Sequence, residues 1–256
     1  MTKLNNLYIE NKNLEVLGID IGGSGMKAAI VDLNTGKFVG ERERIDTPQP
    51  ATPEMMAKVV KQLQKHFNWK GKIGIGFPAA IVDGVVKTAS NIHTSWIGIN
   101  IEQHFEEATK CEVRCMNDVD VAGSAEVIYG AGRKKKGTIA MIALGTGIGT
   151  ALFHNKKLFP NTELGHIQLA GKIAEDYAAN SVRKEEDLSW KKWGKRLNEY
   201  LQEIDKLVWP EIIIIGGGVS KYFEEYEGYL NTRAKVIPAR LKNHAGIIGA
   251  AAQFLE

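Results

Sequence analysis

The sequence predicts an α/β protein made of two similar halves. Two glycine turns, at residues 22–24 and 145–149, lie about half a chain apart, and each joins two strand-like stretches. A second turn follows shortly after each of them, at 34–36 and 155–156. With 256 residues, of which 44% are hydrophobic and 25% charged, the chain is large enough for two packed cores. We therefore expect two domains around a cleft.

In the first half, alternating or fully apolar stretches predict strands at 16–20, 26–33, 38–45, 72–77 and 113–116, with a hairpin across Asp83-Gly84. Thr52-Pro53-Glu54 is a helix start signal, and Asn100 can cap a second helix that ends near Ala108. Asn117 and Asp118 directly follow the last strand. The carboxyl ends of parallel strands are where α/β proteins bind ligands, so both are candidate site residues.

In the second half, strands are expected at 138–144, 150–153, 211–215 and around Val236. Ser189 can cap a helix whose apolar face includes Trp193, Leu197 and Leu201. The glycine run at 216–218 leads into another helix, and a Gly/Ala-rich helix over 243–255 closes the fold.

The charge and cysteine content exclude several classes of protein. A net charge of +3 is too small to indicate a nucleic-acid partner, although basic runs at 133–136 and 191–196 favour a smaller polyanion. Cys111 and Cys115 have no second pair to complete a zinc site, so two buried thiols are expected. Residues 1–13 lack an apolar signal segment, and no apolar run reaches membrane-spanning length. We expect a cytoplasmic protein with no membrane contact.

The glycine clusters favour phosphate binding without matching a standard nucleotide motif. Glycine lets an anion approach peptide N–H groups closely, but none of the three clusters is a P-loop or a G-x-G-x-x-G fingerprint. Each cluster alone would more often be a simple tight turn. Together with Asp20 and the hydroxyls of Ser24 and Thr146, they predict a divided phosphate clamp in which Asp20 holds Mg²⁺ through water.

Asp118 is the candidate general base. In phosphoryl transfer a carboxylate accepts the proton of the attacking hydroxyl late, which requires no large pKa shift. The alternative is that Asp118 merely caps the helix that follows. Glu163 and His166 lie three residues apart and offer the acceptors and donors that a polyol needs, although a lone histidine is more often a satisfied polar residue.

These motifs, in this order, resemble those of the ROK family of sugar kinases over about residues 14–254. The resemblance is carried by Asp20-Ile-Gly-Gly-Ser24, Gly76-Phe-Pro78, Asn91 with Trp96, Asn117-Asp118, Leu144-Gly-Thr-Gly-Ile-Gly149, Glu163-Leu-Gly-His166 and Ile215-Gly-Gly-Gly-Val-Ser220. Within the family, segments 160–166, 171–175 and 188–193 are similar to the polyphosphate glucokinases. The resemblance implies transfer of a phosphoryl group from polyphosphate, or from ATP, to the 6-hydroxyl of glucose.

The resemblance also implies a fold and a set of site residues. The fold is the actin-like ATPase fold of two RNase-H-like domains, 1–117 and 118–242, with the last helix, 243–256, packing back on the first. Asp118 would be the base. The sugar would be held by Asn91, Asn117, Glu163, His166 and Glu175, and the phosphates or nucleotide by Asp20, Gly22, Gly23, Ser24, Lys27, Gly145, Thr146, Gly147, Gly216, Gly217 and Gly218. Mg²⁺ and a homodimer are implied. The family's cysteine-rich zinc motif is missing after His166, so no zinc is expected.

Three other functions stay open at this point. An ATP-dependent glucokinase or another hexose kinase would differ only in its donor or its sugar. A sugar-responsive repressor of the same family would need a helix-turn-helix ahead of the first hairpin, and residues 1–13 are too short and polar for one. A non-catalytic sugar-binding protein would bind the sugar without turnover.

Overall fold

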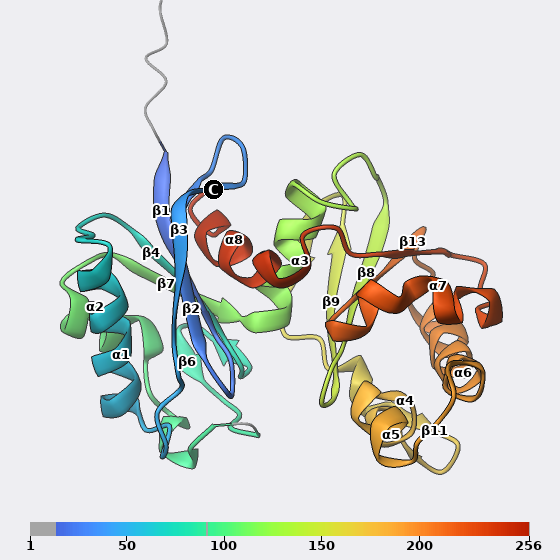
Figure 1. Cartoon of the computed structure of the whole chain (residues 1–256). Coiled ribbons are helices and arrows are strands. Elements are labelled where there is room, and N and C mark those ends of the chain that lie inside the picture. Colours follow the sequence, from blue (N-terminus) through green and yellow to red (C-terminus); the bar gives the residue numbers. More distant parts are fainter. Residues whose placement is uncertain (1–13, 91, 256) are drawn as a thin grey trace, which may run out of the picture.

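The structure is a computed structural model that describes residues 14–90 and 92–255, and it contains two five-stranded sheets side by side (Figure 1). The N-terminal sheet has the strand order β3-β2-β1-β4-β7. Its first three strands are antiparallel neighbours, whereas β4 and β7 join β1 in parallel. The strands are β1 (Glu15–Ile21), β2 (Met26–Asp32), β3 (Lys37–Ile45), β4 (Ile73–Phe77) and β7 (Val113–Asn117).

The C-terminal sheet repeats this plan with the order β10-β9-β8-β13-β14. Again the first three strands in the chain are antiparallel, and the last two join in parallel. The strands are β8 (Thr138–Leu144), β9 (Ile148–His154), β10 (Lys157–Phe159), β13 (Ile212–Gly216) and β14 (Lys235–Pro238). The same order and directions therefore occur twice, which confirms the predicted α/β architecture of two similar halves.

Two short hairpins lie outside these sheets. The first joins β5 (Ile81–Val82) to β6 (Val85–Val86) through Asp83-Gly84, and both turn residues have the positive φ that a two-residue hairpin turn of this kind requires. This hairpin was predicted. The second joins β11 (Gln168–Leu169) to β12 (Lys172–Ile173) and immediately precedes a short helix, α4 (Glu175–Ala178).

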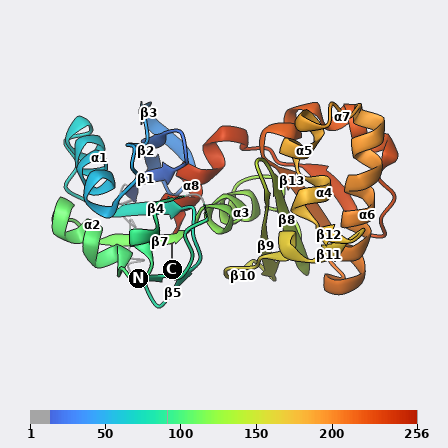
Figure 2. The same cartoon turned by 90° about the horizontal axis from the view of Figure 1, so that it is seen from below.

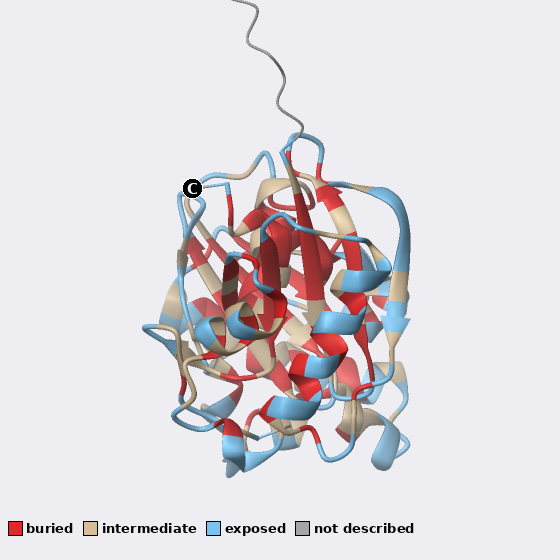
Figure 3. Ribbon diagram, turned by 90° about the vertical axis from the view of Figure 1, so that its left-hand side faces the viewer, coloured by how far each residue is buried: buried red, intermediate tan, exposed pale blue. Residues whose placement is uncertain are grey.

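Helices α1 (Pro53–His66) and α2 (Ile101–Thr109) cover the outer face of the N-terminal sheet (Figure 1). Both predicted caps are confirmed, because Thr52 Oγ1 accepts the Met55 N–H and Asn100 Oδ1 accepts the Gln103 N–H. Figure 3 shows buried residues on the strands and on the inner sides of the helices, with exposed residues on the outer sides. The apolar faces of these helices thus form one core with β1 and β4.

In the C-terminal half, α5 (Asn180–Glu185), α6 (Trp190–Val208) and α7 (Phe223–Tyr226) pack with α4 against the sheet. Ser189 caps α6 as predicted, and the helix buries Trp193, Leu197, Tyr200, Leu201 and Ile204. The helix predicted after the 216–218 glycines is present as α7, which is short and lies between two 3-10 turns. The buried ring of Tyr226 packs against Trp193 of α6. Among the residues described, no helix has the length and apolarity to cross a membrane.

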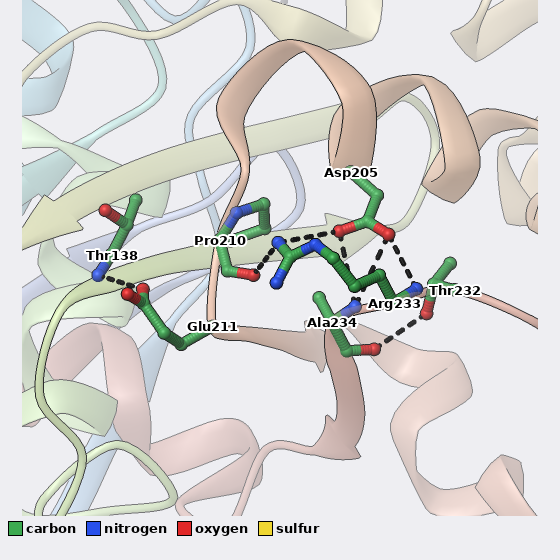
Figure 4. Close-up of polar contacts among 7 residues, drawn as sticks. All are labelled: Thr138, Asp205, Pro210, Glu211, Thr232, Arg233 and Ala234. Carbon is green, nitrogen blue, oxygen red and sulfur yellow. Dashed lines mark hydrogen bonds and ion pairs between the residues drawn. The ribbon is translucent and has the colours of Figure 1, made fainter.

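A polar network fastens the end of α6 to the amino ends of the strands (Figure 4). The buried Asp205 carboxylate accepts the backbone N–H groups of Arg233 and Ala234 and lies 3.1 Å from the Arg233 guanidinium. Arg233 also donates to the Pro210 carbonyl. Glu211 accepts the N–H of Thr138 at the start of β8. These contacts hold β8, β13 and β14 at the end of the sheet opposite the glycine turns.

Two helices lie between the sheets, α3 (Asp118–Ile128) and α8 (Ala245–Ala252) (Figure 2). α8 approaches the N-terminal sheet so closely that the Ile247 and Ala250 carbonyls occupy the places where Gly18 and Gly74 would carry a Cβ. The predicted closing helix over 243–255 is shorter than expected, since a 3-10 turn at 242–244 precedes it. Because α3 contacts strands of both sheets, a domain boundary at 117/118 stays a prediction.

Candidate active site

The first glycine turn connects β1 to β2 and leaves its tip open. The Gly22 N–H bonds to the Gly25 carbonyl at 3.1 Å, while Gly23 and Ser24 are exposed and no atom lies near the place of a Gly23 Cβ. Arg44 on β3 donates to the Ser24 carbonyl at 2.9 Å and fills the space beside Gly25. The sequence interpretation missed Arg44, because nothing in an edge strand indicates which residue reaches a neighbouring turn.

The second glycine turn connects β8 to β9 and is held from outside by α5 and α4. Ser181 donates its N–H to the Gly145 carbonyl and its hydroxyl to the Thr146 carbonyl. Glu175 accepts the Ile148 N–H at 3.2 Å, and its carboxylate occupies the place of a Gly147 Cβ. A side chain at position 147 would therefore have to displace the Glu175 carboxylate, and the turn is held by residues about thirty positions further along the chain.

The third cluster, 216–218, ends β13 next to the second turn. Gly216 pairs with Ala143 in the sheet, and Gly217 has φ +76 with the Leu144 backbone at the place of its Cβ. Gly217 and Gly218 are exposed. The structure thus brings the second and third clusters together at one sheet edge, and Figure 1 shows the β1–β2 and β8–β9 turns at the same end of the molecule.

Asp118 lies at the carboxyl end of β7, as the first residue of α3. Its Oδ1 accepts the Val119 N–H at 2.9 Å. Burial, together with the smaller effect of the Asp20 charge at the end of β1, raises the pKa of Asp118 from 3.8 to about 7. The sequence predicts a base without a large pKa shift. The pKa is raised instead, mainly because the fold buries the carboxyl group and secondarily because it brings the Asp20 carboxylate near.

Asn117, rather than Asp118, is the residue that caps α3. Its Oδ1 accepts the N–H groups of Val119 and Asp120, and its Nδ2 donates to the Ala79 carbonyl at 3.2 Å. Both acceptor positions of the amide are occupied in this way, which leaves one N–H for a ligand. The contact of Asn117 with sugar stays a prediction.

Three of the predicted sugar residues gather around the 160–166 loop. His166 Nε2 lies 3.4 Å from Glu175 Oε1. Partial burial raises the pKa of Glu163, with the charge of His166 opposing the rise and that of Glu175 adding to it. Since Glu175 also accepts the Ile148 N–H, this cluster adjoins the second glycine turn. Side chains of this kind, partly open to solvent, suit the hydroxyls of a sugar.

A cavity of about 400 Å³ opens beside the first glycine turn. It is lined by Gly23, Thr47, Gln49, Pro50, Ala51, Ser90, Ile92 and His93. Asn91, the fifth predicted sugar residue, lies outside the described residues. The cavity adjoins the first glycine turn through Gly23.

Asp20, the predicted Mg²⁺ ligand, provides the carboxylate oxygens that Mg²⁺ prefers, and Asp118 lies near it. The charge of Asp20 contributes to the raised pKa of Asp118, and Lys27 Nζ lies 3.4 Å from Asp20 Oδ2. Mg²⁺ is commonly held by one or two carboxylates together with substrate phosphates, so this donor set fits the ion. Within residues 14–90 and 92–255, no group of three or more acidic, histidine or cysteine side chains could hold a metal. Cys111 and Cys115 are buried free thiols, as expected.

The two basic runs differ in their relation to this site. Residues 133–136 precede β8, so they lie at the opposite end of that strand from the second glycine turn. A seven-residue strand spans about 20 Å, so this run is too far from the second glycine turn to contact a phosphate bound there. On α6, Arg196 is already paired with Glu186 at 2.6 Å, whereas Lys191, Lys192 and Lys195 are exposed.

Comparison with known proteins gives consistent results. A sequence profile of the ROK family matches residues 16–181. The polyphosphate glucokinase of Mycobacterium tuberculosis is 44% identical over 235 residues, which are 91% of this chain and 89% of that protein. The structure of the inorganic polyphosphate/ATP-glucomannokinase of Arthrobacter sp. strain KM is 42% identical, with a TM-score of 0.88 over 93% of this chain and 97% of that one.

A more distant structure shows the same fold. The ROK glucokinase of Streptomyces griseus, solved in complex with glucose and AMPPNP, has a TM-score of 0.78 and 21% identity, covering 93% of this chain and 98% of that one. The predicted actin-like fold is thereby confirmed, since sugar kinases of this group share it.

Proposed function

The chain belongs to the ROK family, and we propose that its glycine turns, Asp118 and the 160–166 loop form the active site of a polyphosphate glucokinase. The enzyme transfers a phosphoryl group from inorganic polyphosphate, with ATP as a second donor, to the 6-hydroxyl of glucose. The observation that carries this conclusion is the 44% identity to the mycobacterial polyphosphate glucokinase over nearly the whole length of both chains.

Asp118 acts as the general base in this proposal. With a pKa of about 7, it is about half ionised at neutral pH and can accept the proton of the 6-hydroxyl as the new O–P bond forms. The phosphorus–oxygen bond to the remaining polyphosphate breaks in the same step, and the shortened chain leaves. Asp118 lies between the two sheets, because it follows the end of β7 and begins α3.

The glycine turns hold the donor. Their exposed peptide N–H groups would bind phosphate oxygens, with Lys27 adding positive charge on the β2 side. Mg²⁺, held by Asp20 through water, would neutralise charge on the transferred group. Glu163, His166 and Glu175 would bind the sugar hydroxyls, which orients the 6-hydroxyl toward Asp118.

The test is formation of glucose 6-phosphate by purified protein with long-chain polyphosphate, ATP or no donor, each with and without Mg²⁺. We expect Mg²⁺-dependent turnover with polyphosphate. Turnover with ATP alone would make the protein an ATP-dependent glucokinase on the same scaffold. Glucose binding without turnover under any donor would indicate a non-catalytic sugar-binding protein, and mannose in parallel reactions defines the sugar range.

We further propose a homodimer located in the cytoplasm. The dimer rests only on the family resemblance. Light scattering coupled to size-exclusion chromatography distinguishes a dimer from the 28.2 kDa monomer, and fractionation of cells tests the location.

A further inference from the structure

We propose that Asn161 is a positioning residue for the sugar site: its side chain fastens the 160–166 loop, and with it Glu163, to the N-terminal half of the molecule. The inference rests on the proposed function, because it takes Glu163 as a sugar ligand. It assigns a role in the reaction to a residue that has no catalytic group of its own.

The side chain of Asn161 binds both backbone groups of Ile81. Its Oδ1 accepts the Ile81 N–H at 3.1 Å, and its Nδ2 donates to the Ile81 carbonyl at 2.8 Å. Ile81 begins the small β5–β6 hairpin that belongs to the N-terminal half. The amide of Asn161 thus pairs with β5 as the backbone of a neighbouring strand would, across a separation of 80 residues.

The backbone of Asn161 is fixed as well. Its N–H donates to Asp120 Oδ2 at 2.8 Å, and Asp120 on α3 is fully buried. Burial raises the pKa of Asp120 to about 6, and the bond from Asn161 opposes that rise, so the peptide N–H stabilises the buried carboxylate. Asn161 has φ +57, a conformation that asparagine tolerates better than most residues.

Both chain neighbours of Glu163 are held by β9. Thr162 Oγ1 donates to the Thr150 carbonyl, and Thr150 Oγ1 lies 2.8 Å from the Thr162 carbonyl. The Leu164 N–H donates to the same Thr150 hydroxyl at 3.1 Å. Glu163 is therefore attached to β9 through both of its neighbours, and Asn161 links the same loop to the N-terminal hairpin. Loss of the link at Asn161 leaves the loop attached to β9 alone, so its position relative to the N-terminal half is less well fixed and the binding of sugar, rather than of donor, becomes less favourable.

The test compares Asn161→Gly with Asn155→Gly. Glycine retains the positive φ and removes the amide. Asn155 is a matched control, because it also has positive φ and side-chain hydrogen bonds but lies in the turn at the far end of β9. We expect the loss of two hydrogen bonds to raise KM for glucose about tenfold in Asn161→Gly, with KM for polyphosphate changed less than twofold. Asn155→Gly should leave both values unchanged.

Hydrogen exchange of the unliganded protein provides a readout that does not depend on activity. We expect faster exchange at Ile81 and over 162–166 in Asn161→Gly only. If Asn161→Gly is too unstable to purify, Asn161→Asp preserves the shape of the side chain and loses the donor to Ile81. We then expect the same result, a raised KM for glucose with KM for polyphosphate changed less than twofold. An active wild type whose variants keep the normal KM for glucose and normal exchange would overturn the proposal. An inactive wild type would refute the proposed function instead, while the exchange result would still decide whether the link at Asn161 exists.

Discussion

Replacing Asp118 by asparagine should stabilise the fold at alkaline pH while abolishing phosphoryl transfer. The pKa of Asp118 in the folded protein, about 7, exceeds the ordinary value of 3.8, so the folded state holds this proton more tightly than the unfolded state does. The resulting contribution to stability is complete below pH 4 and is lost as the pH rises through 7. At about 1.36 kcal/mol per pKa unit, three units correspond to ~4 kcal/mol. Asparagine cannot ionise and avoids this loss.

Urea unfolding of both proteins at pH 5 and pH 8.5 measures the effect. Because part of the loss has already occurred at pH 5, we expect the stability difference between variant and wild type to grow by about 2–3 kcal/mol between the two pH values. Comparing this stability difference at the two pH values cancels the contributions of the other titrating groups, which are the same in both proteins. A difference that is the same at both pH values would refute the assignment of the raised pKa.

The rate profile provides an independent check of the same carboxylate. The base must be ionised, and kcat/KM reports the ionisation of the free enzyme. It should therefore rise about tenfold between pH 6 and pH 8. Removal of a general base costs about 10²–10⁴ in rate. Wild-type kcat in Asp118→Asn, or a profile that is flat over this range, would contradict the role of Asp118.

Three further perturbations test other parts of the site and the fold. Arg44→Gln should raise KM for polyphosphate several-fold and leave KM for glucose unchanged, because Arg44 supports the first glycine turn; Arg42→Gln on the same exposed strand is the control, and equal effects of both would argue against a specific contact. Neutralising Lys134, Lys135 and Lys136 together should change KM for polyphosphate less than twofold, since they lie at the far end of β8; a large rise specific to long chains would place the polyphosphate path over this loop. Gly18→Ala should destabilise the protein by about 1–3 kcal/mol in urea unfolding, because the new Cβ meets the Ile247 carbonyl, whereas Gly228→Ala, with open space around it, should not; equal midpoints would show that α8 can shift.

Local signals predicted the elements well. The caps Thr52, Asn100 and Ser189 form the expected bonds, and the Asp83-Gly84 turn forms the expected hairpin. These features depend on residues within a few positions of each other, which is why a sequence displays them. The helix after Gly218 was predicted, but its short length and its contact with Trp193 of α6 were not, because that contact joins residues about thirty positions apart.

The candidate site was predictable in its residue types and not in its long-range contacts. Asp118, Glu163 and His166 stand out as polar groups at strand ends or within a motif. The raised pKa of Asp118 depends first on burial and then on Asp20, almost a hundred residues earlier, and Asn161 forms hydrogen bonds with Ile81 and Asp120. No periodicity or spacing reveals such pairs. The assignments of the sugar and phosphate ligands, as well as the domain boundaries, stay predictions.

The position of α8 has a consequence for how the protein is made. One face of the N-terminal sheet, which carries Val16, Ala29 and Val31, is covered by Ile247, Ile248 and Ala251 of that helix. These partners are separated by about 220 residues, so their contacts add strongly to the contact order and form late. The half of the chain that is synthesised first therefore cannot complete its core until the final helix has emerged. A chain that stops short of α8 would expose this apolar face, and exposed apolar surface of this kind favours aggregation.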